Sequence, residues 1–316
     1  MSISRNLGAA VAAGVFGLVL AGPAAADFPT RPVSLIVAYG AGGGTDVTAR
    51  MLARDLESAL GQPVTVQNIT GGGGWNGWAA IANADPDGYT IGYINIPNIY
   101  AGYLSPDVSR DENLDSFTLL MNHVTDYCVW AVAPNSPFQS VNDVMDAVAS
   151  GRVSITAHGF GGDEHLAIMR MEAAHGVSFS IVHNNSTADS ITQVLGGHVA
   201  VLGANVSEVA TMHANGELRV IGVMSPERSA FLPDVPTFRE QGFDQVWSVS
   251  RGIAAPAGLP AEVTAKLLDA LETTIASDAH RTAAEALSLA PEVVKGDEYV
   301  SFLVETEQEI KALMGW

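Results

Sequence analysis

The stretch from Tyr39 to Asp46 constrains the fold of this chain most, because a glycine turn there separates two different hydrophobic patterns. The apolar run Ser34–Ala38 precedes the turn, and the amphipathic run Val47–Leu60 follows it. This order predicts a strand, a turn and a helix. Without a Cβ, glycine lets backbone N–H groups approach a bound group, and the positive end of a helix favours an anion. We therefore predict an anion site at this turn.

The same pattern occurs a second time shortly afterwards. Val64–Asn68 is typical of a strand, Gly71–Gly74 of a turn, and Asn76–Ala84 of a short helix. Ligands favour the carboxyl ends of parallel strands, so two such turns at one edge of a sheet could hold one anion between them. Neither turn has the glycine spacing of a nucleotide-binding signature, and no Gly-Lys-Ser/Thr follows. The alternative is a pair of tight turns without a ligand.

Strands and helices continue to alternate, which predicts an α/β fold with a mostly parallel sheet covered by helices. Within the helix after the first turn, we expect Thr45 to be the N-cap and Gly61 to end the helix. The segment 95–122 is rich in Pro, Asp and Asn and is interpreted as an irregular surface connection. A second α/β pattern begins near Tyr127, with a helix expected to start at Ser140-x-x-Asp143.

The order of these patterns predicts two domains, with the chain passing from one domain to the other twice. We assign residues 27–126 and 249–316 to the first domain and 127–248 to the second. A two-domain α/β chain with a double crossing suits hinge closure around a ligand.

Residues 1–26 have the features of an export signal. Arg5 supplies the positive charge of the n-region, and Leu7–Leu20 is the apolar h-region. Ala24-Ala25-Ala26 is a small-residue cleavage site, which predicts cleavage after Ala26. A membrane anchor is the alternative, but the apolar run is short for one. We expect the mature protein to be periplasmic.

Composition restricts the partners. The net charge of −19 argues against nucleic acid and anionic membrane surfaces. The only lysines are Lys266, Lys295 and Lys311, so local N–H groups rather than general steering would have to capture an anion. The single cysteine, Cys128, excludes an internal disulfide and lies in an apolar run, where we expect a buried, inert thiol.

Enzymatic and metal chemistry find little support in the sequence. His158 and His165 flank a third glycine turn, with Asp163 and Glu164 between them, but this spacing matches no zinc signature. There is no G-x-S-x-G or H-E-x-x-H motif. We therefore expect a protein that is not an enzyme, with no metal and no cofactor.

Several short motifs follow one another along the mature chain. They are Phe28-Pro29-Thr30-Arg31-Pro32, Gly42-Gly43-Gly44-Thr45-Asp46, Leu60-Gly61-Gln62-Pro63-Val64, Gly71-Gly72-Gly73-Gly74, Pro86-Asp87-Gly88-Tyr89-Thr90, Leu195-Gly196-Gly197-His198-Val199, Leu232-Pro233-Asp234-Val235-Pro236 and Ala255-Pro256-Ala257-Gly258-Leu259-Pro260. The combination resembles the substrate-binding proteins of tripartite tricarboxylate transporters, the Bug or TctC family. The resemblance covers essentially the whole mature chain.

This resemblance implies a monomeric, two-domain periplasmic-binding-protein-like fold with a ligand cleft between the domains. It also implies a small organic carboxylate ligand and delivery to membrane permease subunits. In such proteins the two loops of the first domain hold a carboxylate through backbone groups and bridging waters. The ligand-binding residues expected here are Tyr39, Ala41, Gly42, Gly43, Thr45, Asp46, Gly72, Gly73, Gly74, Trp75, Asn76, Gly161, Asp163, Asn184, Asn185, Ser186 and Asn205. Because Trp75 is attached directly to the second glycine turn, it is expected as an aromatic wall of the site, with packing in the core as the alternative.

The second domain departs from the family pattern. After the strand ending at Val182, the family usually has an aromatic residue, a lysine and a glycine, whereas this chain has His183-Asn184-Asn185-Ser186. Asp163 and Glu164 stand where small hydroxyl residues are common. We therefore hypothesise that the far end of the ligand is neutral or hydroxylated rather than a further carboxylate. A ligand-presenting sensor would share this fold, and an exported hydrolase is the remaining alternative.

Overall fold

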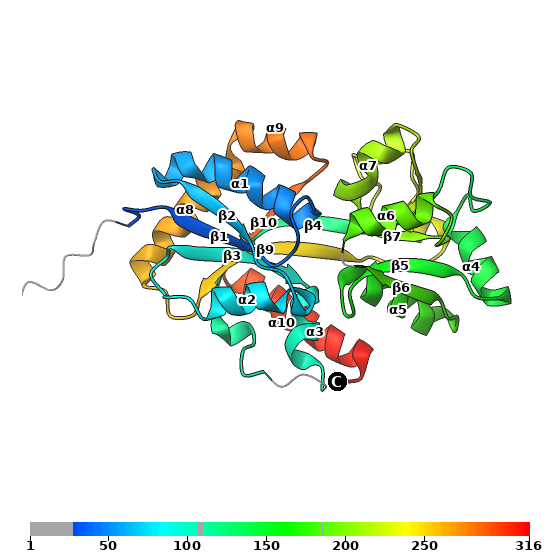
Figure 1. Ribbon diagram of the computed structural model, residues 1–316, viewed down its shortest axis with the longest axis horizontal. Coiled ribbons are helices and arrows are strands. Elements are labelled where there is room, and N and C mark those ends of the chain that lie inside the picture. The colour runs from blue at the N-terminus through cyan, green and yellow to red at the C-terminus, as the bar shows by residue number, and fades with distance from the viewer. Residues whose placement is uncertain (1–27, 107–109, 185) are drawn as a thin grey trace, which may run out of the picture.

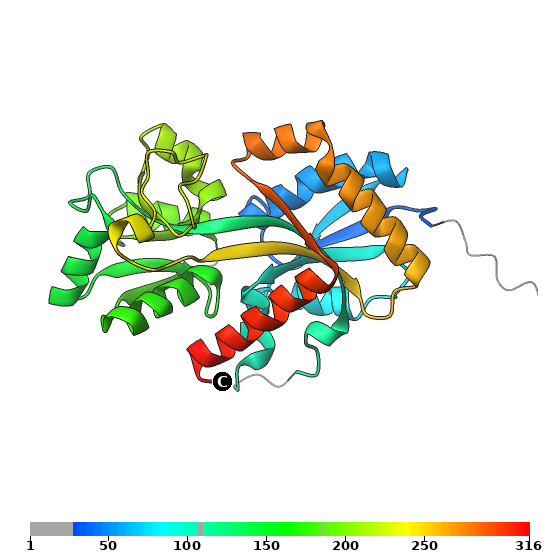
Figure 2. The same ribbon diagram turned by 180° about the vertical axis from the view of Figure 1, so that it is seen from behind.

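The structure, a computed structural model, describes residues 28–106, 110–184 and 186–316. The export signal predicted over residues 1–26 lies outside these ranges. Figures 1 and 2 show two lobes connected by two long strands, β4 (Phe117–Val132) and β9 (Ser248–Pro256). The prediction of an α/β chain with two domains and two crossings is therefore confirmed.

The sheet of the first domain is mixed. Its order is β10 (Pro291–Lys295), β4, β9, β3 (Thr90–Ile96), β1 (Val33–Val37) and β2 (Val64–Asn68). Strand β1 pairs in parallel with β2 and β3, whereas β9 runs antiparallel to β3 and β4. Our prediction of a mostly parallel sheet was wrong for the part of the sheet that contains β9 and β4. Strand β9 returns from the second domain and therefore runs antiparallel to β3.

Helices cover both faces of this sheet (Figure 1). One face carries α1 (Gly44–Leu60), α8 (Ala261–Ala276) and α9 (Asp278–Ala286); the other carries α2 (Trp75–Ala82), α3 (Asn98–Leu104) and α10 (Gly296–Met314). In α1, Leu52 and Leu56 are buried one turn apart, which explains why this helix packs with α8 over the sheet. Gly61 ends α1 with φ 65°, as predicted.

Two local predictions in the first domain were wrong. Gly43, not Thr45, is the N-cap of α1; Thr45 is buried, and its hydroxyl accepts a hydrogen bond from Asn95 Nδ2 at 2.9 Å. The segment 95–122 is not irregular, since it contains the end of β3, helix α3, a short 3₁₀ turn over Leu114–Ser116 and the start of β4. Polar residues such as Asn122 interrupt the apolar pattern of β4, but they are buried and bonded to distant segments.

The second domain is built on the far half of β4. Strands β7 (Leu202–Asn205) and β8 (Arg219–Val223) pair with β4, and β5 (Ser154–His158) pairs in parallel with β6 (Ser180–Asn184). Helices α4 (Val141–Ser150) and α5 (Asp163–His175) lie on one side, and α6 (Thr187–Leu195) and α7 (Val206–Ala214) on the other (Figure 1). Helix α4 begins with a capping box of Ser140 and Asp143, as predicted.

Strand β4 changes its partners at the junction of the two lobes. Tyr127 is its last residue paired with β9, and Cys128 is its first residue paired with β7. Cys128 is buried, as predicted, and burial raises the pKa of its thiol.

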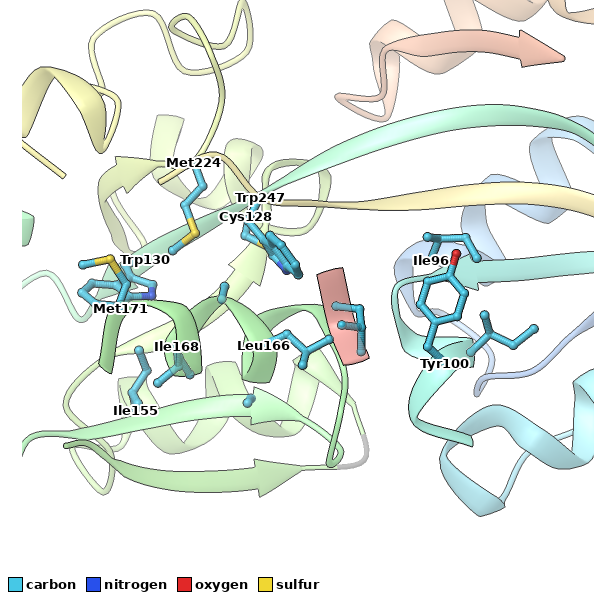
Figure 3. Close-up of a cluster of buried hydrophobic side chains, with 14 of the residues drawn as sticks. Ile96, Tyr100, Cys128, Trp130, Ile155, Leu166, Ile168, Met171, Met224 and Trp247 are labelled. Atoms are coloured by element: carbon cyan, nitrogen blue, oxygen red, sulfur yellow. The ribbon is translucent and has the colours of Figure 1, made fainter. Parts of the chain in front are cut away.

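An apolar cluster extends across this junction. Figure 3 shows Ile96 and Tyr100 from the first lobe on one side and Leu166 and Trp247 from the second on the other. All four side chains are buried, so the two lobes are packed against each other in this structure. No helix within the described ranges is long and apolar enough to span a bilayer.

Candidate ligand site at the domain junction

The first glycine turn connects β1 to α1. Its N-cap, Gly43, has no side chain with which to cap the first turn of the helix, and Gly42 has φ 82°. Asp46 fixes the turn from within: its Oδ2 accepts hydrogen bonds from Gly42 N at 2.8 Å and Arg50 Nε at 2.9 Å. Asp46 thus pairs with Arg50, four residues later on the same helix.

The Asp46 carboxylate is held in its charged form. Burial by itself would raise its pKa, but hydrogen bonds from Arg50, Gly42 and Asn68 outweigh burial and lower the pKa. Since Arg50 offsets the negative charge, Asp46 shapes the turn and leaves the amino end of α1 available to an anion.

The second glycine turn lies beside the first. Gly71, Gly72, Gly73 and Gly74 all have positive φ, at 113°, 59°, 68° and 105°, a backbone run that only glycine adopts readily. Residues Gly72–Gly74 form a 3₁₀ turn that leads into α2.

Hydrogen bonds hold the two turns together. Asn68 Nδ2 donates to Tyr39 O at 2.9 Å, and Ile69 N donates to Val37 O at 2.9 Å. Asn76 Nδ2 donates to Thr70 O at 3.1 Å and so supports the second turn. The structure thus brings together the two turns that the sequence predicted separately.

Trp75 lies in the core of the first domain, where we expected a wall of the site. Its side chain is 1% exposed, and its ring packs against Trp78 and Tyr103 at centroid distances of 5.8 and 6.0 Å. The Arg110 guanidinium lies 4.8 Å from the ring centroid. These neighbours all belong to the first domain, while the indole N–H is buried and has no hydrogen-bond acceptor among the described residues.

Asp163 connects the two domains. It is the first residue of α5, and its Oδ1 accepts a hydrogen bond from Asn98 Nδ2 of the first domain at 3.1 Å. Its Oδ2 accepts from Asn205 Nδ2 at 2.9 Å. Asn98 is not among the residues predicted from the sequence, because it lies in the segment that we interpreted as irregular.

The third glycine turn packs directly on the first domain. A Cβ added to Gly161, which has φ 73°, would lie 2.1 Å from Ala101 Cβ. Gly161 N donates to His165 Nδ1 at 2.9 Å. Burial, followed by the neighbouring His183, lowers the pKa of His165 to about 4, so the imidazole is neutral and can accept this bond.

Two further predicted site residues, Asn184 and Ser186, lie around the start of α6. The Asn184 side chain is bonded within the second domain, to Ser190 Oγ at 3.0 Å and to Gln193. Ser186 is the N-cap of α6, where its Oγ accepts from Asp189 N at 3.1 Å. These local bonds account for the Asn184 and Ser186 side chains without a ligand. Asn185 lies outside the described residues.

Arg251, on β9, is the most important residue that the sequence analysis missed. Its side chain is 2% exposed, and its Nη1 lies 2.9 Å from Asp126 Oδ2 on β4. A Cβ added to Gly44 would be only 2.6 Å from Arg251 Nη2, so the guanidinium lies next to the amino end of α1. Arg251 could have been found from the sequence as a charged residue inside an apolar strand. A buried charge requires a partner, so such a residue points to a polar site.

Three titratable side chains of the second domain lie beside this region. Glu164 Oε1 is 3.7 Å from His158 Nδ1, and Glu208 Oε1 accepts from Thr187 Oγ1 at 2.8 Å. The His158 ring centroid is 6.4 Å from that of Tyr39 in the first glycine turn. Burial and the nearby Asp163 raise the pKa of Glu164, while Glu164 and Glu208 raise that of His158 against the effect of burial.

Within the described ranges, no group of three or more His, Cys, Asp or Glu side chains is arranged to hold a metal ion.

Two α/β domains that meet at a buried polar junction, with turns from both domains converging there, define a two-domain solute-binding protein of the periplasmic-binding-protein kind. Residues 48–315 match the model of TctC, the tripartite tricarboxylate transporter family receptor, and the chain belongs to this family. Family and fold are those of solute-binding proteins rather than enzymes.

Individual relatives agree with this assignment. The chain is 29% identical over 312 residues to the UPF0065 protein in the gbd 5′ region of Cupriavidus necator, covering 97% of this chain and 94% of the relative. It is 29% identical to protein BugT of Bordetella pertussis, covering 92% and 90% of the two chains. The solved structure of the periplasmic binding protein BugD superposes with a TM-score of 0.78 at 26% identity, covering 91% of this chain and 97% of that one.

Proposed function

We propose that this protein captures a small organic carboxylate between its two domains in the periplasm. It then delivers the ligand, as a monomer, to the membrane permease of a tripartite tricarboxylate transporter. The observation that carries this proposal is the pair of adjacent glycine turns at the carboxyl ends of β1 and β2, next to the amino end of α1. We place the domain boundaries at residues 126/127 and 248/249, beside the point where β4 changes partners.

Arg251 supports an anionic ligand. Its Nε is buried and has no hydrogen-bond acceptor among the described residues, while Nη1 lies beside Asp126. A buried donor without an acceptor is costly, and a carboxylate oxygen is the strongest acceptor for a guanidinium. A carboxylate between the first glycine turn and Arg251 would accept hydrogen bonds from both.

The test begins with the ligand itself. Small molecules released from the purified protein are identified by mass spectrometry, and a set of carboxylates is screened by thermal shift. A carboxylate at a hundred times its Kd stabilises the folded protein by about 2.7 kcal/mol, which such a screen detects. If no carboxylate raises the melting temperature, the proposal is wrong.

The role of Arg251 has its own prediction. Arg251→Lys keeps the positive charge but removes the planar pair of donors, so we expect the Kd for the carboxylate to rise about tenfold or more. Arg31→Lys is the control, because Arg31 is exposed and pairs with Asp87 on the surface. Isothermal titration calorimetry compares the two variants. Equal Kd values for both variants would contradict a direct contact between Arg251 and the ligand.

Delivery requires a separate measurement. Uptake of the labelled ligand is followed in cells that contain the permease, with and without this protein. We expect uptake to depend on the protein; uptake at the same rate without it would contradict the delivery role.

A further inference from the structure

The junction between the domains contains more buried negative than positive charge. Asp126, Asp163 and Glu164 are each less than 5% exposed, and Glu208 lies beside them. Arg251 and His158 are the cations at this junction within the described residues. Up to four negative charges thus face at most two positive charges, although burial raises the pKa of both Glu164 and Glu208. A ligand with two or three carboxylates would add further negative charge in a region of low dielectric, where like charges repel strongly.

Three of these four carboxylates are engaged by hydrogen bonds that shape the protein. Asp126 accepts from the N–H and the hydroxyl of Ser207, and Asp163 accepts from Asn98 and Asn205. Glu208 accepts from Thr187 Oγ1 and from the N–H of Asn205, where it forms a capping box at the start of α7. These bonds account for the three carboxylates without a ligand.

Glu164 is different. Its side chain is 3% exposed, its Oε1 lies 3.7 Å from His158, and its Oε2 has no hydrogen-bond donor among the described residues. It is the second residue of α5, and a Cβ added to Gly203 on β7 would lie 3.3 Å from Glu164 Cβ. Its charge also reaches the first glycine turn, since burial, followed by Asp163 and Glu164, raises the pKa of Tyr39. An unpaired buried carboxylate oxygen is costly, and an ammonium group is a donor that would both pair with it and neutralise it.

We propose that the ligand is zwitterionic: an amino-carboxylate whose carboxylate is held by the glycine turns and Arg251, and whose ammonium group binds Glu164. This inference rests on the proposed function and specifies the class of its substrate. A zwitterion adds no net charge to the junction, whereas a dicarboxylate adds two negative charges. It replaces the earlier expectation of a neutral or hydroxylated far end, because a hydroxy acid adds one negative charge to the junction whereas the zwitterion adds none.

The test uses pairs of ligands that differ only in an amino or a hydroxyl group. Calorimetry measures the Kd of the full-length mature protein for glycine and glycolate, alanine and lactate, 4-aminobutyrate and 4-hydroxybutyrate, and 6-aminohexanoate and 6-hydroxyhexanoate. Succinate and adipate represent the dicarboxylates. We expect the tightest ligand to be an amino member, bound about tenfold or more tightly than its hydroxyl counterpart, because an ammonium–carboxylate bond is charge-assisted.

Variants then locate the contact. Glu164→Gln keeps the shape of the side chain and removes its charge, so the preference for the amino over the hydroxyl member is expected to fall about tenfold while the hydroxyl member binds as before. Glu285→Gln makes the same chemical change on the exposed surface and is expected to leave both Kd values unchanged. Circular dichroism confirms that each variant is folded.

The possible failures are distinguishable. If none of these carboxylates binds and none is recovered from the purified protein, the proposed function itself is contradicted. If hydroxy acids or dicarboxylates bind as tightly as the amino acids or more tightly, only the zwitterion inference is overturned. A Glu164→Gln variant that weakens both members of a pair equally also overturns it, since Glu164 would then support the fold without contacting an ammonium group.

Discussion

At the scale of single residues, two buried histidines connect Tyr93 to Asp55 through a chain of hydrogen bonds. In the first domain, Tyr93 Oη lies 2.6 Å from His123 Nδ1, His123 Nε2 lies 2.9 Å from His280 Nε2, and His280 Nδ1 lies 2.8 Å from Asp55. The Asp55 carboxylate accepts from His280, so with neutral rings His123 donates to His280 and Tyr93 donates to His123. Burial lowers the pKa of His123 well below its usual value, in agreement with this order.

His165 yields a prediction about pH. The pKa of His165 is lowered from 6.5 to about 4 in the folded state, so between these values the unfolded chain binds more protons. The contribution of His165 to the free energy of unfolding is therefore fully present above pH 6.5 and is lost as the pH falls toward 4. We expect this loss to be about 3 kcal/mol.

Urea unfolding from pH 7.5 to pH 4 measures this contribution. His165→Asn lacks the titrating ring, so its stability should fall less steeply with decreasing pH than that of the wild type. His198→Asn is the control, since His198 is exposed. Parallel pH profiles for wild type and His165→Asn would show that His165 makes no such contribution.

At the scale of elements, the position of α2 decides whether the two glycine turns meet. Gly77 on α2 lies so close to the first domain's sheet that an added Cβ would be 2.6 Å from Ala38 Cα and 2.8 Å from Ile69 O. Ala38 precedes the first glycine turn, and Ile69 precedes the second. The absence of a side chain at Gly77 therefore allows α2 to lie against the backbone of both connections.

Replacing Gly77 tests this arrangement. Gly77→Ala forces α2 away from Ala38 and Ile69, so we expect a loss of stability of about 1–3 kcal/mol and weaker binding of the carboxylate. Gly151→Ala is the matched control, because nothing lies within 4 Å of an added Cβ there. Chemical unfolding and calorimetry measure the two effects, and a Gly77→Ala variant as stable as Gly151→Ala would contradict the explanation.

At the scale of the whole molecule, one contact between the two domains is made by two small residues. Gly161 of the second domain faces Ala101 of α3, and Asp163 bonds to Asn98 at the start of the same helix. Arg170 of α5 also pairs with Glu309 of α10, and β4 and β9 connect the domains, as Figures 1 and 2 show from opposite sides. Two strands that cross between domains permit hinge motion. The contact at Gly161 is therefore a position where one added methyl group can block closure of the two domains.

Gly161→Ala should prevent this contact, because its Cβ would lie 2.1 Å from Ala101 Cβ. We expect the Kd for the carboxylate to rise about tenfold or more, since part of the closed state is lost. In the double variant Gly161→Ala with Ala101→Gly, the obstructing methyl group is removed and affinity should recover.

Gly159→Ala is the matched control, because Gly159 also has a positive φ, 55°, but an added Cβ meets nothing within 4 Å. Calorimetry gives the affinities, and small-angle scattering of the ligand-bound forms gives the degree of closure. Equal affinities for Gly161→Ala and Gly159→Ala would show that the contact with Ala101 does not limit closure.

The sequence by itself determined the α/β class, the double crossing and the two glycine turns. These features follow from local physics: hydrophobic periodicity, the backbone freedom of glycine in Gly71–Gly74, and capping residues such as Ser140. Helix α3, which carries Asn98, was not predicted, because its buried residues are stabilised by contacts with distant segments rather than by its own pattern.

Only the tertiary structure decided which polar residues meet at the junction. Arg251 and Asp126 are 125 positions apart along the chain, on β9 and β4, and they pair because the two crossing strands lie side by side. Likewise, Glu164 Oε2 becomes a carboxylate oxygen without a hydrogen-bond donor only when folding removes it from water. The pKa and the partners of a buried charge depend on its surroundings. Here the surroundings come from both domains through long-range packing, which no local sequence pattern encodes.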